Sequence, residues 1–278
     1  MAGNMTIEAK RLYVDGPYGQ VHLRQANPLA DKALNTPLIC FHQSPMSGIQ
    51  YRPFQDEMAT DRVVYCPDTP GFGGSDTPPG VVTVGDYAKA MAVVLDSLGY
   101  GKGGAGPVDV FGGHTGSVIG TELAVIRPDL VRKITFPSVA LFSDEQKTMM
   151  MQRFGGPPAY FTDPDFVALS YKQTVLEGHV ELDPERRLEL FAERLRSGMK
   201  AWYAPEAVMS YDAYGQLQKV IQPTLLLVLD DMLAENTRQA GALLPDATVV
   251  EMTHIPHALA WDMHAAEIGE VLRNFLDK

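Results

Sequence analysis

Apolar residues in the first half of the chain alternate between short continuous runs and longer segments with helical spacing. The runs LICF, VVYC, VDVF and KITF are bounded by turn residues, which is typical of strands buried on both faces of a sheet. Between them, residues 83–99 place five apolar side chains on one helical face and end in Gly99, a residue suited to stop a helix. This alternation predicts an α/β fold with a mostly parallel central sheet and helices on both faces.

Two segments depart from the alternation. Residues 11–26 predict an antiparallel hairpin around the turn GPYG. From residue 141 to 214 only helical patterns follow one another; the third, residues 183–203, starts at Asp183-Pro184 with four apolar residues on one face. We therefore predict a core of residues 1–140 and 215–278, with a helical cap of residues 141–214 over the carboxyl edge of the sheet, where such folds bind ligands.

Composition narrows the possible partners. The 278 residues are 45% hydrophobic and carry a net charge of -11, which excludes the basic footprint that nucleic-acid binding needs. No apolar run approaches the ~20 residues of a membrane span, and the first residues lack the pattern of a secretory signal. Cys40 and Cys66 both lie in strand patterns and are interpreted as buried reduced thiols. We expect a cytoplasmic monomer or homodimer with a small-molecule substrate.

The segment FGGHTGSVIGTELA links a strand to a helix through a glycine-rich turn. Gly112, Gly113 and Gly116 provide the small neighbours that a tight strand-to-helix turn requires, and Thr115 carries a hydroxyl in its middle. Hydrolases place a nucleophile on such a turn in a strained backbone conformation, which is unusual for a β-branched residue. The plainer interpretation is that Thr115 is an ordinary helix N-cap.

Four motifs occur in the order found in the α/β-hydrolase family, and together the chain resembles that family along nearly its whole length. ICFHQSP resembles the loop that begins the oxyanion hole, with Gln43 where glycine is usual. YCPDTPGFGGSD is similar to the Pro-Asp-x-Pro-Gly-x-Gly-x-Ser segment of the family. GGHTGS stands where Gly-x-Ser-x-Gly is expected, as in a capped branch with His-Thr-Gly, and LDDML and HIPHALAWD resemble the acid and histidine segments.

The resemblance implies a catalytic triad with Thr115 as nucleophile and His257 as base. His257 has the family's spacing to an acidic residue, whereas we interpret His42 and His114 as packing residues. Of the two adjacent aspartates after the late strand, the following Met-Leu selects Asp231 as the acid, with Asp230 as the alternative. The oxyanion hole is expected from the backbone N–H groups of Ser44 and Gly116.

These expectations favour a hydrolase of a carbonyl compound, such as an ester, a lactone or a substrate cleaved at a C–C bond. One alternative is a cofactor-free lyase, isomerase or oxygenase in which His257 is the general base and Thr115 donates a hydrogen bond; another is a non-catalytic ligand-binding protein. We expect no cofactor and no metal, because histidines and cysteines lack ligand spacing. An apolar or aromatic substrate is expected in a pocket lined by Gln43, His114, Trp202, Tyr203 and Trp261, and the arginines of residues 186–196 are interpreted as a solvated face.

Overall fold

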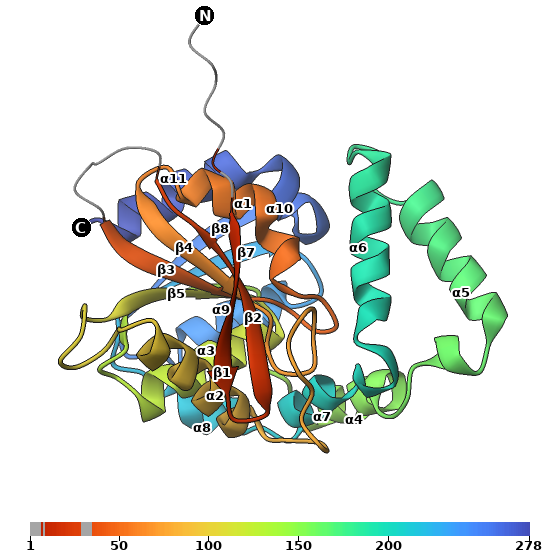
Figure 1. Cartoon of the computed structure of the whole chain (residues 1–278), viewed down its shortest axis with the longest axis horizontal. Coiled ribbons are helices and arrows are strands. Elements are labelled where there is room, and N and C mark those ends of the chain that lie inside the picture. Colours follow the sequence, from red (N-terminus) through yellow and green to blue (C-terminus); the bar gives the residue numbers. More distant parts are fainter. Residues whose placement is uncertain (1–6, 8, 29–34) are drawn as a thin grey trace, which may run out of the picture.

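The computed structural model of the chain describes residue 7 and residues 9–28 and 35–278. Its centre is one eight-stranded sheet in the order β1-β2-β4-β3-β5-β6-β7-β8 (Figure 1). The strands are β1 Lys10–Gly16, β2 Gly19–Ala26, β3 Asn35–Phe41, β4 Arg62–Pro67, β5 Val108–Gly112, β6 Val131–Pro137, β7 Thr224–Asp230 and β8 Ala247–Pro256. The opening hairpin is antiparallel and joins β4 antiparallel, whereas all other neighbours pair in parallel. The predicted fold class is confirmed.

Helices cover both faces of the sheet. One apolar layer packs under α2 Val84–Ser97, α3 Thr115–Ile126 and α9 Ala234–Gly241. The opposite layer packs under α1 Arg52–Met58, α10 Ala260–Met263 and α11 Ala265–Leu276. No helix in the described part of the chain combines the length and apolar character needed to cross a membrane.

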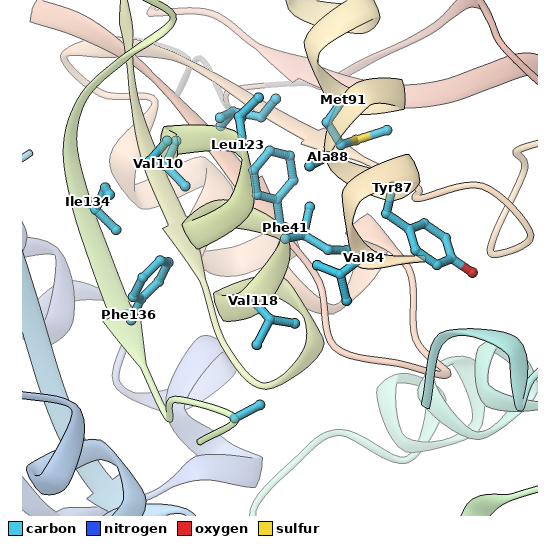
Figure 2. Packing of buried hydrophobic residues seen from close by; sticks show 14 of the residues in the cluster. Phe41, Val84, Tyr87, Ala88, Met91, Val110, Val118, Leu123, Ile134 and Phe136 are labelled. Carbon is cyan, nitrogen blue, oxygen red and sulfur yellow. The ribbon is translucent and has the colours of Figure 1, made fainter. Parts of the chain in front are cut away.

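Side chains of each central strand supply both layers in turn. Val110 of β5 packs toward α3, whereas the next residue, Phe111, stacks on Phe54 of α1 with ring centroids 4.7 Å apart. Figure 2 shows Val110 in the first layer with Ile134 and Phe136, facing the helices that cover it. Successive strand residues point to opposite faces, so a strand covered on both sides must be apolar throughout.

The segment between β6 and β7 contains only helices in the described structure. They are α4 Asp144–Phe154, a 3-10 turn Ala159–Phe161, α5 Pro164–Tyr171, a π-helical turn Lys172–Leu176, α6 Pro184–Arg196, a 3-10 turn Gly198–Lys200, α7 Tyr203–Met209 and α8 Ala213–Leu217. Asp183 caps α6 as predicted, its side chain accepting the N–H of Glu185. The single helix predicted over residues 183–203 is wrong: α6 ends at Arg196, and Gly198 takes a φ of 61° before α7 begins.

Helix α6 stands beside the sheet domain near α1 and α10 (Figure 1). The apolar face predicted for it is wrong in part, because Leu188 and Met199 are 48% and 49% exposed. Phe191 of the predicted face is buried, and the other buried positions of the helix are the charged residues Arg186 and Glu193. This helix is therefore held by polar contacts as well as by apolar packing.

Asp68 organises the PDTPGFGGSD loop. Its carboxylate accepts the N–H groups of Gly48 at 2.9 Å and Gly74 at 2.7 Å, and it pairs with Nδ1 of His22 at 2.8 Å. Burial alone would raise the pKa of Asp68, but the hydrogen bonds from His22 and Gly74, together with the two nearby imidazoles, outweigh it, so its pKa lies below the ordinary value. The ionised form is the one that the folded loop requires.

We expect Asp68→Asn to lower the free energy of unfolding at neutral pH by about 2–4 kcal/mol, because an amide cannot accept from all three donors. A carboxyl with a lowered folded pKa stabilises above its unfolded pKa of about 3.9 and loses that contribution as the pH falls further. Urea unfolding at several pH values should therefore show the gap from wild type closing in acid. The exposed Asp230→Asn is the control, and an equal loss in that variant would contradict the account.

Candidate active site

The turn between β5 and α3, which we call the elbow, has its strained residue at His114. His114 has φ 51° and ψ -120°, whereas Thr115 is the first residue of α3 and has no positive φ. A Cβ on Gly116 would lie 2.0 Å from the carbonyl oxygen of Phe41, and one on Gly112 would lie 2.6 Å from that of Gly116. These contacts leave no room for side chains on either side of the turn.

The prediction that Thr115 holds the strained central position is therefore wrong. Gly112 and Gly116 flank His114 symmetrically, two residues away on each side, so the Gly-x-Ser-x-Gly spacing centres on the histidine. The spacing of the two glycines was the signal in the sequence for this register of the turn. The hydroxyl of Thr115 favoured the neighbouring residue instead. The neighbouring strand end is strained too: Ser138 has φ 69°, and its carbonyl accepts the N–H of His114 at 2.8 Å. Strained non-glycine residues cluster at functional sites.

The side chain of His114 is paired with Asp231. Nε2 of His114 lies 3.2 Å from Oδ2 of Asp231, and Oδ1 of that carboxylate accepts the N–H of Leu233 at 2.8 Å. Burial raises the pKa of Asp231, but the hydrogen bond from His114 and the other polar groups around the carboxylate together outweigh it, so its pKa lies below the ordinary value. Asp231 is thus ionised and faces the elbow, while the adjacent Asp230 is exposed at the end of β7.

His257 lies beside this pair at the end of β8. Its ring centroid is 4.7 Å from that of His114 and 5.6 Å from that of Trp261. Burial, followed by the proximity of His114, lowers the pKa of His257 to about 3, and the opposing charge of Asp231 restores only part of it. The imidazole is neutral at neutral pH and is a weak base.

No hydrogen bond joins His257 to Thr115 among the described residues. The hydroxyl oxygen of Thr115 instead accepts the N–H of Ser44 at 3.3 Å. The carboxylate of Asp231 likewise contacts His114, so the predicted chain from acid to His257 to threonine is replaced by a carboxylate and two imidazoles at the elbow. The tertiary structure brings together Asp231, His257 and the histidine that we interpreted as a packing residue.

The predicted oxyanion donors are only partly suitable. The N–H of Gly116 already donates to the carbonyl of Gly113 at 2.9 Å, so this assignment is wrong. Thr115 now follows the elbow residue, and its N–H has no acceptor within the described structure. Ser44 belongs to a loop fixed by buried His42, whose Nε2 accepts the N–H of Thr69 at 2.9 Å. The N–H groups of Ser44 and Thr115 are the pair with the required positions.

The predicted pocket residues separate into two groups. Trp261 is 4% exposed and packs with Tyr51, Phe54 and Phe111, so it supports His257 from the core rather than lining a pocket. Gln43 is half-buried in the loop that contains Ser44. Trp202 and Tyr203 are also half-buried, and their rings stack edge to face at 5.0 Å at the start of α7.

Arg186 joins the cap to the core, which corrects its interpretation as part of a solvated face. Its guanidinium is 7% exposed and lies 2.7 Å from Asp262 of α10 and 2.7 Å from Glu189. It also donates to the carbonyl of Gln50 at 3.0 Å. Asp262 directly follows Trp261, so this contact links α6 to the segment that supports His257. We call Arg186, Glu189 and Asp262 the cap latch.

Breaking the cap latch should destabilise the protein because it leaves a largely buried charge without its partner. We expect Arg186→Met to cost about 3 kcal/mol of unfolding free energy, within the range for buried pairs. The double variant Arg186→Met/Asp262→Asn should cost less than the sum of the single variants, by about 1–3 kcal/mol. Denaturant unfolding of all four proteins measures this coupling, and strict additivity would show that the latch is not a stabilising pair.

The carboxylate and the two imidazoles at the elbow also have the composition of a metal site. One ligand atom each from His114, Asp231 and His257 can be chosen so that all three lie within 4.8 Å of one another. Sequence spacing gave no sign of this, because the three residues follow three different strands, β5, β7 and β8.

The fold and the glycine-flanked turn define the class of the protein. A sequence profile of the alpha/beta hydrolase family matches residues 40–270, and the chain therefore belongs to that family. No curated protein matches the chain.

Solved structures show the same fold at low sequence identity. An esterase from Thermogutta terrifontis shares 20% identity over 97% of this chain and 98% of its own, with a TM-score of 0.73. An enol-lactonase from Burkholderia xenovorans LB400 shares 16% over 96% and 100%, with a TM-score of 0.77. A haloalkane dehalogenase loop variant from Bradyrhizobium elkanii shares 18% over 97% of each chain, with a TM-score of 0.72.

Proposed function

We propose that the protein is a hydrolase of small carbonyl compounds, esters or lactones, in which an imidazole at the nucleophile elbow replaces the hydroxyl. Membership of the α/β-hydrolase family and structural likeness to an esterase and an enol-lactonase support the reaction class. The observation that carries the proposal is the position of His114: it has the strained backbone of the elbow and contacts an ionised carboxylate. An elbow residue is presented to substrate at the edge of the sheet.

In this proposal His114 activates a water molecule. Asp231 holds the ring and stabilises the positive charge that the ring acquires when it takes the water proton. The resulting hydroxide attacks the substrate carbonyl, and the leaving group takes up the proton held by His114 as the C–O bond breaks. His257 is neutral and offers an N–H donor close by. Among the described residues no base is hydrogen-bonded to the hydroxyl of Thr115, which disfavours the threonine nucleophile expected from the sequence.

The developing oxyanion would be bound by the N–H groups of Ser44 and Thr115. The N–H of Ser44 donates to the hydroxyl oxygen of Thr115 at 3.3 Å, which is longer than a typical hydrogen bond and easily exchanged for a stronger one to an oxyanion. The hydroxyl of Thr115 then acts as a polar wall of the site. We propose that a small apolar or aromatic substrate binds between the elbow and the cap.

The first test compares His114→Ala, Asp231→Asn and Asp230→Asn on a panel of aryl esters and lactones. General base catalysis contributes ~10²–10⁴ in rate, so we expect kcat/KM to fall at least ~10²-fold in His114→Ala. Asp231→Asn should fall by a similar order, whereas the exposed Asp230→Asn should match wild type. A fully active His114→Ala together with an inactive Thr115→Ala would instead support Thr115 as the nucleophile.

Replacing the strained residue should separate stability from activity. Glycine adopts positive φ freely, so His114→Gly is expected to relieve part of a strain of about 1–3 kcal/mol and to raise or preserve the free energy of unfolding while ester hydrolysis is lost. Thermal unfolding and kcat/KM on the same sample provide the check. A clearly less stable His114→Gly would mean that the ring, rather than the backbone, dominates the energetics of the turn.

A second candidate is a cofactor-free lyase, isomerase or oxygenase. The absence of a hydroxyl at the elbow position favours it, because such enzymes need a base and donors but no covalent nucleophile. Reaction in ¹⁸O-labelled water distinguishes the two: hydrolysis places the label in the product acid, whereas proton abstraction alone does not. Tight binding of panel compounds without turnover would indicate a ligand-binding protein instead.

A further inference from the structure

We propose that His114, Asp231 and His257 form a binding site for one divalent transition-metal ion, with Zn²⁺ as the representative. Two imidazoles and one carboxylate make an N₂O ligand set. Zinc sites of catalytic type use three such ligands and leave a fourth position for water. The inference is independent of the proposed function, because metal binding is measured without substrate.

The spacing of the ligand atoms supports a shared ion. Zn–N and Zn–O bonds of about 2.0–2.2 Å at tetrahedral angles place two ligand atoms roughly 3.3–3.5 Å apart. Nε2 of His114 and Oδ2 of Asp231 are 3.2 Å apart, close to that spacing. A direct charge-assisted N–H···O bond is usually about 2.7–2.9 Å long. The observed pair is thus wider than an optimal ion pair and close to two ligands of one ion.

The third ligand needs only a small adjustment. All three ligand atoms lie within 4.8 Å of one another, so the nitrogen of His257 is within little more than an ångström of the spacing that a shared ion requires. No hydrogen bond holds its ring in the described part of the chain, and the ring packs beside those of His114 and Trp261.

The carboxylate is prepared for monodentate binding. Oδ1 of Asp231 is occupied by the N–H of Leu233, which leaves Oδ2 as the oxygen directed at the imidazoles. Hydrogen bonds of this kind orient metal ligands and fix which atom binds. His114 is held by the backbone of the elbow, so two of the three ligands have fixed positions before any ion arrives.

A second group of histidines provides a matched control. His254 and His264 contact Glu267, but through different carboxylate oxygens, at 2.6 Å and 3.4 Å. Glu267 and His254 are largely exposed. Surface groups of this kind bind zinc weakly and without a defined cavity, so His254→Ala reports adventitious binding.

The experiment is a calorimetric titration of the chelator-treated full chain with Zn²⁺. We expect one equivalent to bind, with affinity reduced by at least ~100-fold in Asp231→Asn and His257→Gln, beyond the effect typical of outer-shell partners. Asp230→Asn and His254→Ala should retain wild-type affinity. Binding that persists in Asp231→Asn and His257→Gln, or that disappears in His254→Ala, would overturn the proposal.

A spectroscopic measurement guards against a variant that folds poorly. Co²⁺ bound to wild type should give the intense visible absorption of a four-coordinate site, and Asp230→Asn should give the same spectrum; a spectrum typical of the hydrated ion would overturn the proposal. Zinc occupies imidazole lone pairs that the base reaction needs, so the proposed metal-free reaction is assayed on chelator-treated protein. If zinc binds but the metal-free protein has no hydrolytic activity, only the proposed function fails.

Discussion

The tight turn from β5 into α3 is the constraint on which the site depends. The chain reverses there within a few residues, and the backbone of α3 lies so close to β3 that a Cβ at Gly116 would collide with the carbonyl of Phe41. The turn is closed only if one residue adopts a positive φ, and His114 is the residue that does so, at a cost in backbone strain. Its imidazole is consequently held at the carboxyl edge of the sheet, where Asp231 directly follows β7 and His257 directly follows β8.

Burial then determines what these groups can do. Asp231 remains ionised because the imidazole of His114 and the other polar groups around it outweigh the effect of its burial. His257 has no comparable hydrogen bond in the described residues and stays neutral. One cluster therefore contains an anion beside a neutral imidazole and the elbow histidine, which gives it both proton-transfer and metal-ligand character. The cap latch reaches the same region through Asp262, next to the tryptophan that packs on His257.

Much of the fold could be predicted because its signals are local. The continuous apolar runs predicted the parallel strands, and the loss of strand pattern after residue 140 predicted the helical segment. Predictions for α6 were weaker: Leu188 has the spacing of the predicted buried face but is exposed, and the helix turns Arg186 inward because Asp262 and Gln50 lie opposite it. Spacing gives a helix its periodicity, but the partner across the interface decides which face is buried.

The sequence by itself determined the sheet, its helices and the set of segments that meet at the carboxyl edge, since hydrophobic period and glycine spacing act over a few residues. It also contained the elbow register, in the symmetric placement of Gly112 and Gly116 around His114. Only the tertiary structure decided that Asp231 contacts His114 while Thr115 receives the N–H of Ser44. Those contacts join residues more than seventy positions apart, and their partners depend on strand order and burial, which local patterns do not encode.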